Sequence, residues 1–308
     1  MVANHSHPAY VRLGAETVAK RAAELQAMMH SCRLCPHECN VNRLGGEIGL
    51  CRVGDSPKVS SFGPHFGEET PLVGRCGSGT IFLTCCNLRC LFCQNYDISQ
   101  LDRGDEVTTE RLAEMMLNLQ TQGCHNINWV TPTHQVPVLV EGTRIALERG
   151  LNLPIVYNCG GYESVETLGL LDGIVDIYMP DAKYGDSEVG AKLSGAKFYW
   201  ERCREALAEM HRQVGDLEID AEGVARRGLL VRHLVLPENL AKTEIVMEYI
   251  ASLSQDTYVN VMAQYRPQHR AYEIDELARH ITKQEFEWAV QVALDAGLHR
   301  LDKRWAGL

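Results

Sequence analysis

The chain has 308 residues, of which 45% are hydrophobic and 23% are charged, a composition typical of a folded globular protein that argues against disorder. Its formal net charge of −10 argues against broad electrostatic binding to nucleic acid or to an anionic membrane. The first residues, MVANHSHPAY, lack the basic and apolar regions of a secretory signal, and no apolar run is long enough to span a membrane. These features predict a cytoplasmic protein.

Residues 14–31 have the spacing of an amphipathic helix, and a stretch rich in cysteine and glycine then runs to about residue 78 with little periodicity. From residue 79 onward, short apolar runs alternate with longer helical patterns. The predicted strands are residues 79–84, 126–130, 154–157, 175–179, 229–236 and 258–262. The predicted helices between them include residues 109–122, 136–149 and 239–253.

Alternating strands and helices predict parallel β-α units. Six units are too few for an eight-stranded barrel, so we expect an α/β fold, either a partial (β/α)6 TIM-type barrel or an open doubly wound sheet. We expect a small cysteine-rich metal-binding region over residues 1–78, followed by the barrel and C-terminal helices over residues 79–308. In either fold, ligands bind at the carboxyl ends of the strands.

Three cysteines directly follow the first predicted strand, in the segment GTIFLTCCNLRCLFCQN. Cys86, Cys90 and Cys93, here called the cysteine triplet, can bind three irons of a 4Fe-4S cluster and leave the fourth iron open for chemistry. Two alternatives remain at this point. The spacing also fits the buried stripe of a helix, and three thiolates can bind zinc.

The segment CNLRCLFCQN, with Phe92 before the third cysteine, resembles the radical SAM signature, and the surrounding chain is similar to the pyruvate formate-lyase activating enzymes. The resemblance implies a 4Fe-4S cluster that cleaves S-adenosylmethionine to a 5′-deoxyadenosyl radical, which abstracts hydrogen from a substrate. That substrate is unidentified and could be a glycyl radical enzyme, another protein, a peptide or a small molecule. The resemblance also implies an electron donor such as flavodoxin or ferredoxin.

Polar residues at the ends of later strands are candidate cofactor contacts. The resemblance implies that the VTPTHQVP loop takes the place of a Gly-Gly-Glu-Pro loop that lies beside the methionine amino group in radical SAM proteins. The alternative is that these residues only form a turn bounded by prolines. A similar Asp-x-Lys lies near the cofactor carboxylate in the activating enzymes, which implies that role for Asp181 and Lys183; the alternative is a surface ion pair. A charged arginine within an apolar strand, such as Arg232, needs a carboxylate partner. The candidates are Thr131, Thr133, His134, Asn158, Asp181, Lys183 and Arg232.

Four further cysteines, Cys32, Cys35, Cys39 and Cys51, form the pattern C-x2-C-x3-C-x11-C and are here called the N-terminal cysteine set. Four thiolates can close the shell of a structural zinc ion or of an auxiliary 4Fe-4S cluster, and the spacing does not decide between them. Ordinary reduced cysteines without metal are the third alternative.

Two functions compete with the enzyme hypothesis. The first is a non-catalytic iron-sulfur or zinc protein that serves as an interaction scaffold, and the second is electron transfer without cofactor cleavage. A scaffold does not need polar side chains at successive strand ends, so Asp181, Lys183 and Arg232 favour catalysis over it. Electron transfer alone predicts reduction of the cluster without cleavage of the cofactor.

Overall fold

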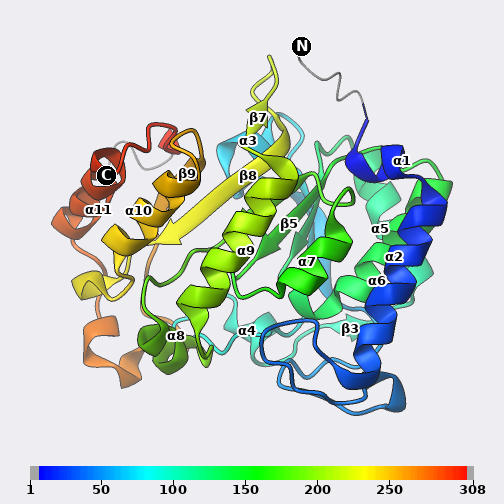
Figure 1. Ribbon diagram of the computed structural model, residues 1–308, viewed down its shortest axis with the longest axis horizontal. Helices are drawn as coiled ribbons and strands as arrows, with labels where there is room; N and C mark the ends of the chain where they lie inside the picture. The colour runs from blue at the N-terminus through cyan, green and yellow to red at the C-terminus, as the bar shows by residue number, and fades with distance from the viewer. Residues whose placement is uncertain (1–6, 304–308) are drawn as a thin grey trace.

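A computed structural model describes the structure of residues 7–303. Residues 1–6, which form part of the stretch used to predict the absence of a signal, lie outside the described residues. The described chain forms an open α/β sheet with helices along its outer side (Figure 1).

Six parallel strands form the centre of the sheet, and they pair in the order in which they follow one another in the chain. The prediction of a partial (β/α)6 barrel is therefore confirmed. Each observed strand overlaps its predicted range, although the fifth begins earlier than expected. The strands are β2 (Ser78–Leu83), β4 (Ile127–Val130), β5 (Ile155–Cys159), β6 (Ile177–Pro180), β8 (Ala225–Leu234) and β9 (Tyr258–Met262).

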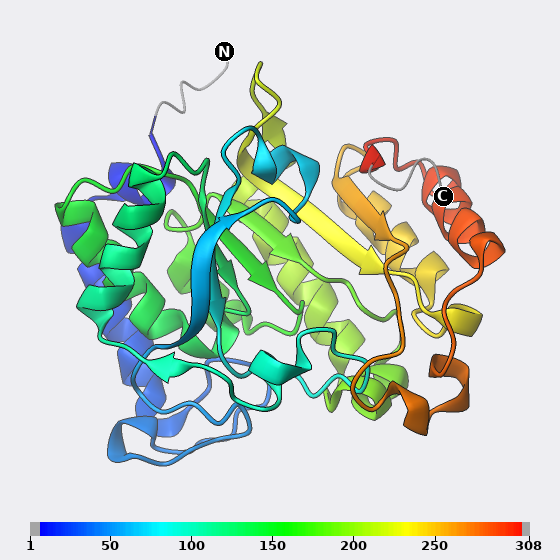
Figure 2. The same ribbon diagram turned by 180° about the vertical axis from the view of Figure 1, so that it is seen from behind.

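Antiparallel strands extend this sheet at both sides. Strand β1 (Lys58–His65) pairs with β2 along most of its length, and β3 (Asp105–Glu106) pairs with the start of β1. Strand β7 (Glu218–Ile219) pairs with β8. Figure 2 shows β1 beside the parallel strands. The segment before residue 79 thus contributes a strand to the main sheet, where the sequence suggested irregular structure.

The helices between β1 and β9 connect successive strands and several of them pack on the outer side of the sheet, whereas the helices before residue 58 precede the first strand and the helix after residue 262 follows the last. Thr108 caps α5 by accepting a hydrogen bond from the backbone N–H of Arg111, and Gly123 and Gly150 follow α5 and α6 with φ of 84° and 94°. Within residues 7–303, no helix is both long and apolar enough to cross a membrane. The helices are α1 (Ala9–Leu13), α2 (Ala15–Ala27), α3 (Thr70–Val73), α4 (Tyr96–Ser99), α5 (Thr109–Thr121), α6 (Val136–Glu148), α7 (Val165–Leu171), α8 (Ser187–Ser194), α9 (Tyr199–Val214), α10 (Thr243–Leu253) and α11 (Lys283–Asp295).

Short 3-10 turns complete the described elements. They are η1 (Met28–Ser31), η2 (Arg43–Gly45), η3 (Thr133–Gln135), η4 (Pro237–Asn239), η5 (Ala271–Glu273) and η6 (Asp275–Leu277).

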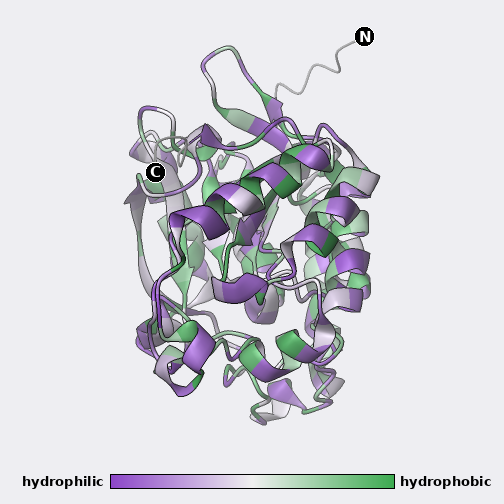
Figure 3. Ribbon diagram, turned by 90° about the vertical axis from the view of Figure 1, so that its left-hand side faces the viewer, coloured by the Kyte–Doolittle hydropathy of each residue, from purple (hydrophilic) through white to green (hydrophobic). Residues whose placement is uncertain are grey.

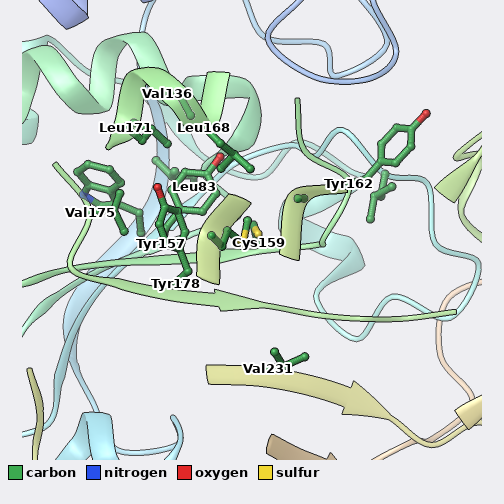
Figure 4. Packing of buried hydrophobic residues seen from close by; sticks show 14 of the residues in the cluster. Leu83, Val136, Tyr157, Cys159, Tyr162, Leu168, Leu171, Val175, Tyr178 and Val231 are labelled. Carbon is green, nitrogen blue, oxygen red and sulfur yellow. The ribbon is translucent and has the colours of Figure 1, made fainter. Parts of the chain in front are cut away.

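The core lies between the sheet and its helices. Tyr157 on β5 and Tyr178 on β6 are fully buried and contact each other edge to face, and Leu168 and Leu171 of α7 belong to the same core (Figure 4). Polar residues instead collect on the outer faces of the helices (Figure 3). Because apolar packing fixes the strands, the loops at their carboxyl ends extend from a rigid base.

Candidate functional site

A cavity of about 390 Å³ opens at the carboxyl ends of the parallel strands and is here called the strand-end cavity. Its volume lies in the range of small-molecule sites. The side chains that line it include the whole cysteine triplet and most of the predicted cofactor contacts, namely Cys86, Cys90, Cys93, Thr131, Asn158, Asp181, Lys183 and Arg232. Residues from five separate strand ends therefore meet in one place.

The cysteine triplet lies on the loop that leaves β2. Residues 86–93 are not helical, so the alternative in which they form the buried stripe of a helix is wrong. Just before the triplet, Cys85 has a φ of 68°, a left-handed conformation that is uncommon outside glycine and turns the chain sharply after the strand.

Each sulfur of the triplet has a hydrogen-bonding neighbour. The backbone N–H of Leu88 donates to Cys86 Sγ at 3.3 Å, the Ser194 hydroxyl donates to Cys90 Sγ at 2.9 Å, and Cys93 Sγ lies 3.1 Å from Ser99 Oγ. Burial raises the pKa of the Cys86 and Cys90 thiols. Hydrogen bonds to sulfur are a known feature of iron-sulfur sites, so this donor set fits a cluster.

Within residues 7–303, no three cysteine, histidine or acidic side chains converge as ligands of a single metal ion. A cube-shaped cluster does not need that convergence, because each thiolate binds a different iron.

A charged network faces the triplet across the strand-end cavity. Arg232 Nε donates to Asp181 Oδ1 at 2.7 Å, its Nη2 donates to Asn158 Oδ1 at 2.7 Å, and Lys183 Nζ donates to Asp181 Oδ2 at 2.6 Å. Burial opposes the charge on Asp181, but Arg232 and Lys183 outweigh it and hold the pKa of this carboxyl below its ordinary value. The network is therefore ionised at neutral pH.

Two acidic residues that the sequence analysis missed complete this network. Glu68 and Glu69, just before α3, place carboxylate oxygens 3.9 Å and 3.7 Å from Arg232 Nη1. Glu69 Oε1 accepts a hydrogen bond from Asn260 Nδ2, whereas Glu69 Oε2 is buried without a hydrogen-bond partner among residues 7–303. Three carboxylates, those of Asp181, Glu68 and Glu69, therefore lie around Arg232.

The pair Glu68 and Glu69 carries no periodic signal in the sequence, because it lies in the connection between β1 and β2. Its place beside Arg232 depends on how that connection crosses the open side of the sheet near β9, where Asn260 holds it.

The structure does not bring all of the predicted loop residues to the strand-end cavity. Thr131 lines it and has a φ of 61°, which is rare for a β-branched residue and marks local strain. Thr133 instead is buried and donates to Glu163 Oε1 at 2.8 Å, and His134 is buried with Nε2 2.9 Å from the Thr84 carbonyl. The 3-10 turn η3 directs both side chains into the protein, which explains why they do not line the cavity.

His134 and His233 are both internal. Burial lowers the pKa of His134 to about 3 and that of His233 to about 4, so both rings are neutral at physiological pH. His233 lies between the Ala182 carbonyl and the Thr243 hydroxyl, opposite to its neighbour Arg232. The alternation of a strand thus sends the arginine to the cavity and the histidine to the core.

The N-terminal cysteine set lies outside the strand-end cavity, on the loop between η1 and β1. Three of its members are buried and Cys39 is half-buried.

Comparisons with known proteins bear on the family to which the chain belongs. A model of the radical SAM superfamily matches residues 80–219, which contain the cysteine triplet and the Asp181 and Lys183 pair. The chain is 34% identical over 273 residues to the uncharacterized protein MJ0674 of Methanocaldococcus jannaschii, covering 85% of this chain and 74% of that protein. It is also 26% identical over 197 residues to the uncharacterized protein MJ0808 of the same organism, covering 57% and 53%.

Among solved structures, the chain is similar to HydG, a maturase of the FeFe-hydrogenase, with a TM-score of 0.47 and 12% identity over 70% of this chain and 48% of that one. It is also similar to TYW1 with a lysine-pyruvate adduct bound, with a TM-score of 0.38 and 12% identity over 68% and 73%. The chain thus spans about half the length of HydG and of MJ0808. On the family model and the one-third identity to MJ0674 across most of both proteins, the chain belongs to the radical SAM superfamily, whose members use a 4Fe-4S cluster to cleave S-adenosylmethionine.

Proposed function

We propose that this chain binds a 4Fe-4S cluster through the cysteine triplet and S-adenosylmethionine in the strand-end cavity, and that it removes a hydrogen atom from a polypeptide substrate. When bound and reduced, the cluster supplies the electron that splits the cofactor into methionine and a 5′-deoxyadenosyl radical. The observation that carries the proposal is the buried charged network of Asp181, Lys183 and Arg232, which faces the three thiols in one cavity.

The charges of this network match those of the cofactor. S-adenosylmethionine carries an ammonium, a carboxylate and a sulfonium group, and hence a net positive charge, whereas the cavity offers it both the two cations of the network and the carboxylates of Asp181, Glu68 and Glu69. Lys183 and Arg232 would bind the carboxylate, and Glu69 Oε2, which has no hydrogen-bond partner among the described residues, would accept a hydrogen bond from the ammonium. Such contacts would orient the sulfonium bond toward the cysteine triplet and exclude water from the reacting atoms.

A polypeptide substrate, such as a glycyl radical enzyme or a smaller peptide, is supported by the rim of the cavity. Gly67 and Asn95 line the cavity and are exposed, and the neighbouring Phe66 has 63% of its surface exposed. An extended chain could reach the cavity from this rim, with Phe66 as an apolar contact.

The first test is anaerobic reconstitution with iron and sulfide, followed by dithionite, S-adenosylmethionine and an assay for 5′-deoxyadenosine. Wild type should release deoxyadenosine, a variant with all three triplet cysteines changed to alanine should release none, and the exposed-cysteine control Cys76→Ala should match wild type. If wild type holds a cluster yet never cleaves the cofactor, even with candidate polypeptides present, the proposed function is wrong.

The cofactor contacts have a separate test. Lys183→Met should weaken S-adenosylmethionine binding in calorimetric titrations, whereas the exposed-lysine control Lys192→Met should not. For the substrate, transfer of deuterium from a labelled polypeptide into 5′-deoxyadenosine would identify the hydrogen donor, and its absence with every polypeptide tested would favour a small molecule.

A further inference from the structure

The N-terminal cysteine set is folded as a compact group. Cys35 is close enough to Cys32 and Cys51 to interact with both, and Cys39 likewise interacts with Cys32 and Cys51. A Cβ atom at Gly49 would lie 2.6 Å from Cys39 Sγ, so the chain passes this sulfur at a distance that glycine permits. The loop is therefore shaped around its thiols.

Backbone donors point at these sulfurs in the same way as in the cysteine triplet. The N–H of His37 donates to the sulfur of Cys35, and the N–H of Val41 donates to the sulfur of Cys39. In both pairs the donor lies two residues after the cysteine. The cysteine triplet has the same spacing, since the Leu88 N–H donates to the sulfur of Cys86. Hydrogen bonds to sulfur stabilise the thiolate form that binds metals.

A buried cation lies against the set. Arg43 is 2% exposed, and its Nη1 lies 3.9 Å from Cys32 Sγ. Its other polar partner in the described part of the chain is the carbonyl of Gly54, which its Nε reaches at 3.0 Å. A buried guanidinium is costly without an anion to compensate it. A metal centre with four thiolates is anionic and would provide that charge.

The N-terminal cysteine set adjoins the loop of the cysteine triplet at three points. His37 Nε2 donates to the Asn87 carbonyl at 2.7 Å, and the Arg89 guanidinium donates to the Leu50 carbonyl. Cys51 packs in one small buried cluster with Cys85, directly before the triplet. Figures 1 and 2 both show the loop of residues 32–55 beneath the sheet, beside the loop that follows β2.

We propose that the N-terminal cysteine set holds a second 4Fe-4S cluster, which passes single electrons to the cluster of the cysteine triplet through the contact between His37 and Asn87. The inference rests on the proposed function, because the electron is needed for cofactor cleavage. An external one-electron reductant loses one electron, the second cluster gains it and then gives it up, and the triplet cluster ends one electron richer. No bond is made or broken in this relay.

Iron-sulfur chemistry is preferred to zinc because of the location of the set. A structural zinc ion needs no buried connection to a redox centre, whereas here His37, within the ligand loop itself, contacts the residue next to Cys86. Asn87 and Cys85 are also almost fully buried, so solvent does not separate the two sets. Cys39, the half-buried member, leaves one side of the set accessible to an external donor.

The first experiment counts metal in the reconstituted full-length protein. In the variant lacking all three triplet thiols, about half of the wild-type iron and sulfide should remain, with its own electron paramagnetic resonance signal after dithionite, because two cubic clusters hold equal iron. Cys35→Ser/Cys39→Ser should lose the other half and keep the signal that S-adenosylmethionine perturbs. Zinc in place of iron at the N-terminal set, or no metal there, would overturn the proposal.

The second experiment keeps every ligand and tests the relay. His37→Ala should retain the iron content and slow the reduction of the triplet cluster, followed by stopped-flow absorbance, whereas His30→Ala, an exposed histidine of the same segment, should leave the rate unchanged. Equal rates in the two variants would refute the relay. If both clusters assemble but the cofactor is never cleaved, the proposed function fails instead, so the two failures are distinguishable.

Discussion

Replacing Arg232 by glutamine should destabilise the protein more than any exposed charge replacement. Arg232 is the cation that Asp181, Glu68 and Glu69 share at the strand-end cavity, and its side chain is 16% exposed. Without it, Asp181 retains its ion pair with Lys183, but the ion pairs of Glu68 and Glu69 with Arg232 are lost. Removing one partner of a buried ion pair typically costs about 3–5 kcal/mol, because the remaining charges stay desolvated.

This free energy corresponds to a measurable shift in the thermal midpoint. At about 2 °C per kcal/mol, the value for larger domains, the midpoint followed by circular dichroism should fall by about 6–10 °C. The control is Arg111→Gln, since Arg111 is 54% exposed and pairs with the exposed Glu114 on one turn of helix. Exposed pairs contribute about 0–1 kcal/mol, so the control should shift the midpoint by less than about 2 °C.

The pH dependence adds a second criterion. In wild type, Arg232 and Lys183 keep the pKa of Asp181 below its ordinary value, so this carboxyl stabilises the fold above that value and loses its contribution as the pH falls through the folded pKa. In Arg232→Gln, no guanidinium opposes the effect of burial, so the pKa of Asp181 should rise. The stability that this variant loses relative to wild type should therefore become smaller as the pH falls from about 8 to about 5. A deficit as small as that of Arg111→Gln, at any pH, would show that the network is not an ionised buried cluster.

Three further predictions concern positions around the site. Burial raises the pKa of Glu163 to about 7 from 4.5, so wild type should lose up to about 3 kcal/mol of stability as the pH rises through that interval, and Glu163→Gln should flatten the unfolding profile. Gly161→Ala should weaken S-adenosylmethionine binding, because its Cβ would lie 2.4 Å from the Asp181 carbonyl. Gly215→Ala, with similar φ and open space, should cost only about 1–2 kcal/mol of stability and leave binding unchanged. Asp186→Ala should cost about 1 kcal/mol in urea unfolding, because Asp186 caps α8, and no loss would contradict that role.

The parallel strands could be predicted from sequence because they are buried on both faces. Strand β4, for example, is the fully buried run INWV. Strand β1 could not be predicted in this way, since it alternates irregularly between buried and exposed positions and contains Gly63 and Pro64. Proline is tolerated there because β3 pairs only with Lys58 and Val59 at the other end of the strand.

Side-chain direction limited the prediction of the site in a similar way. In an extended strand, alternation fixes which residues share a face, so Arg232 and His233 had to point to opposite sides. Within the turn after β4, no such rule applies, and the sequence did not reveal that Thr133 and His134 point inward while Thr131 faces the cavity. Glu68 and Glu69 could not be found because contacts between distant segments depend on the fold.

The register of the sheet explains why the charged network has the most firmly fixed geometry in the site. Asp181 and Arg232 occupy facing positions of a parallel bridge between the ends of β6 and β8, and Asn158 is the penultimate residue of the adjacent β5. Their mutual distances are thus set by backbone pairing and by the core beneath, which is how precise sites are held. The rim around Phe66 and Asn95 belongs to loops without such support. Variation in a family with this architecture should accordingly change the substrate at the rim while the strand ends continue to hold the same cofactor.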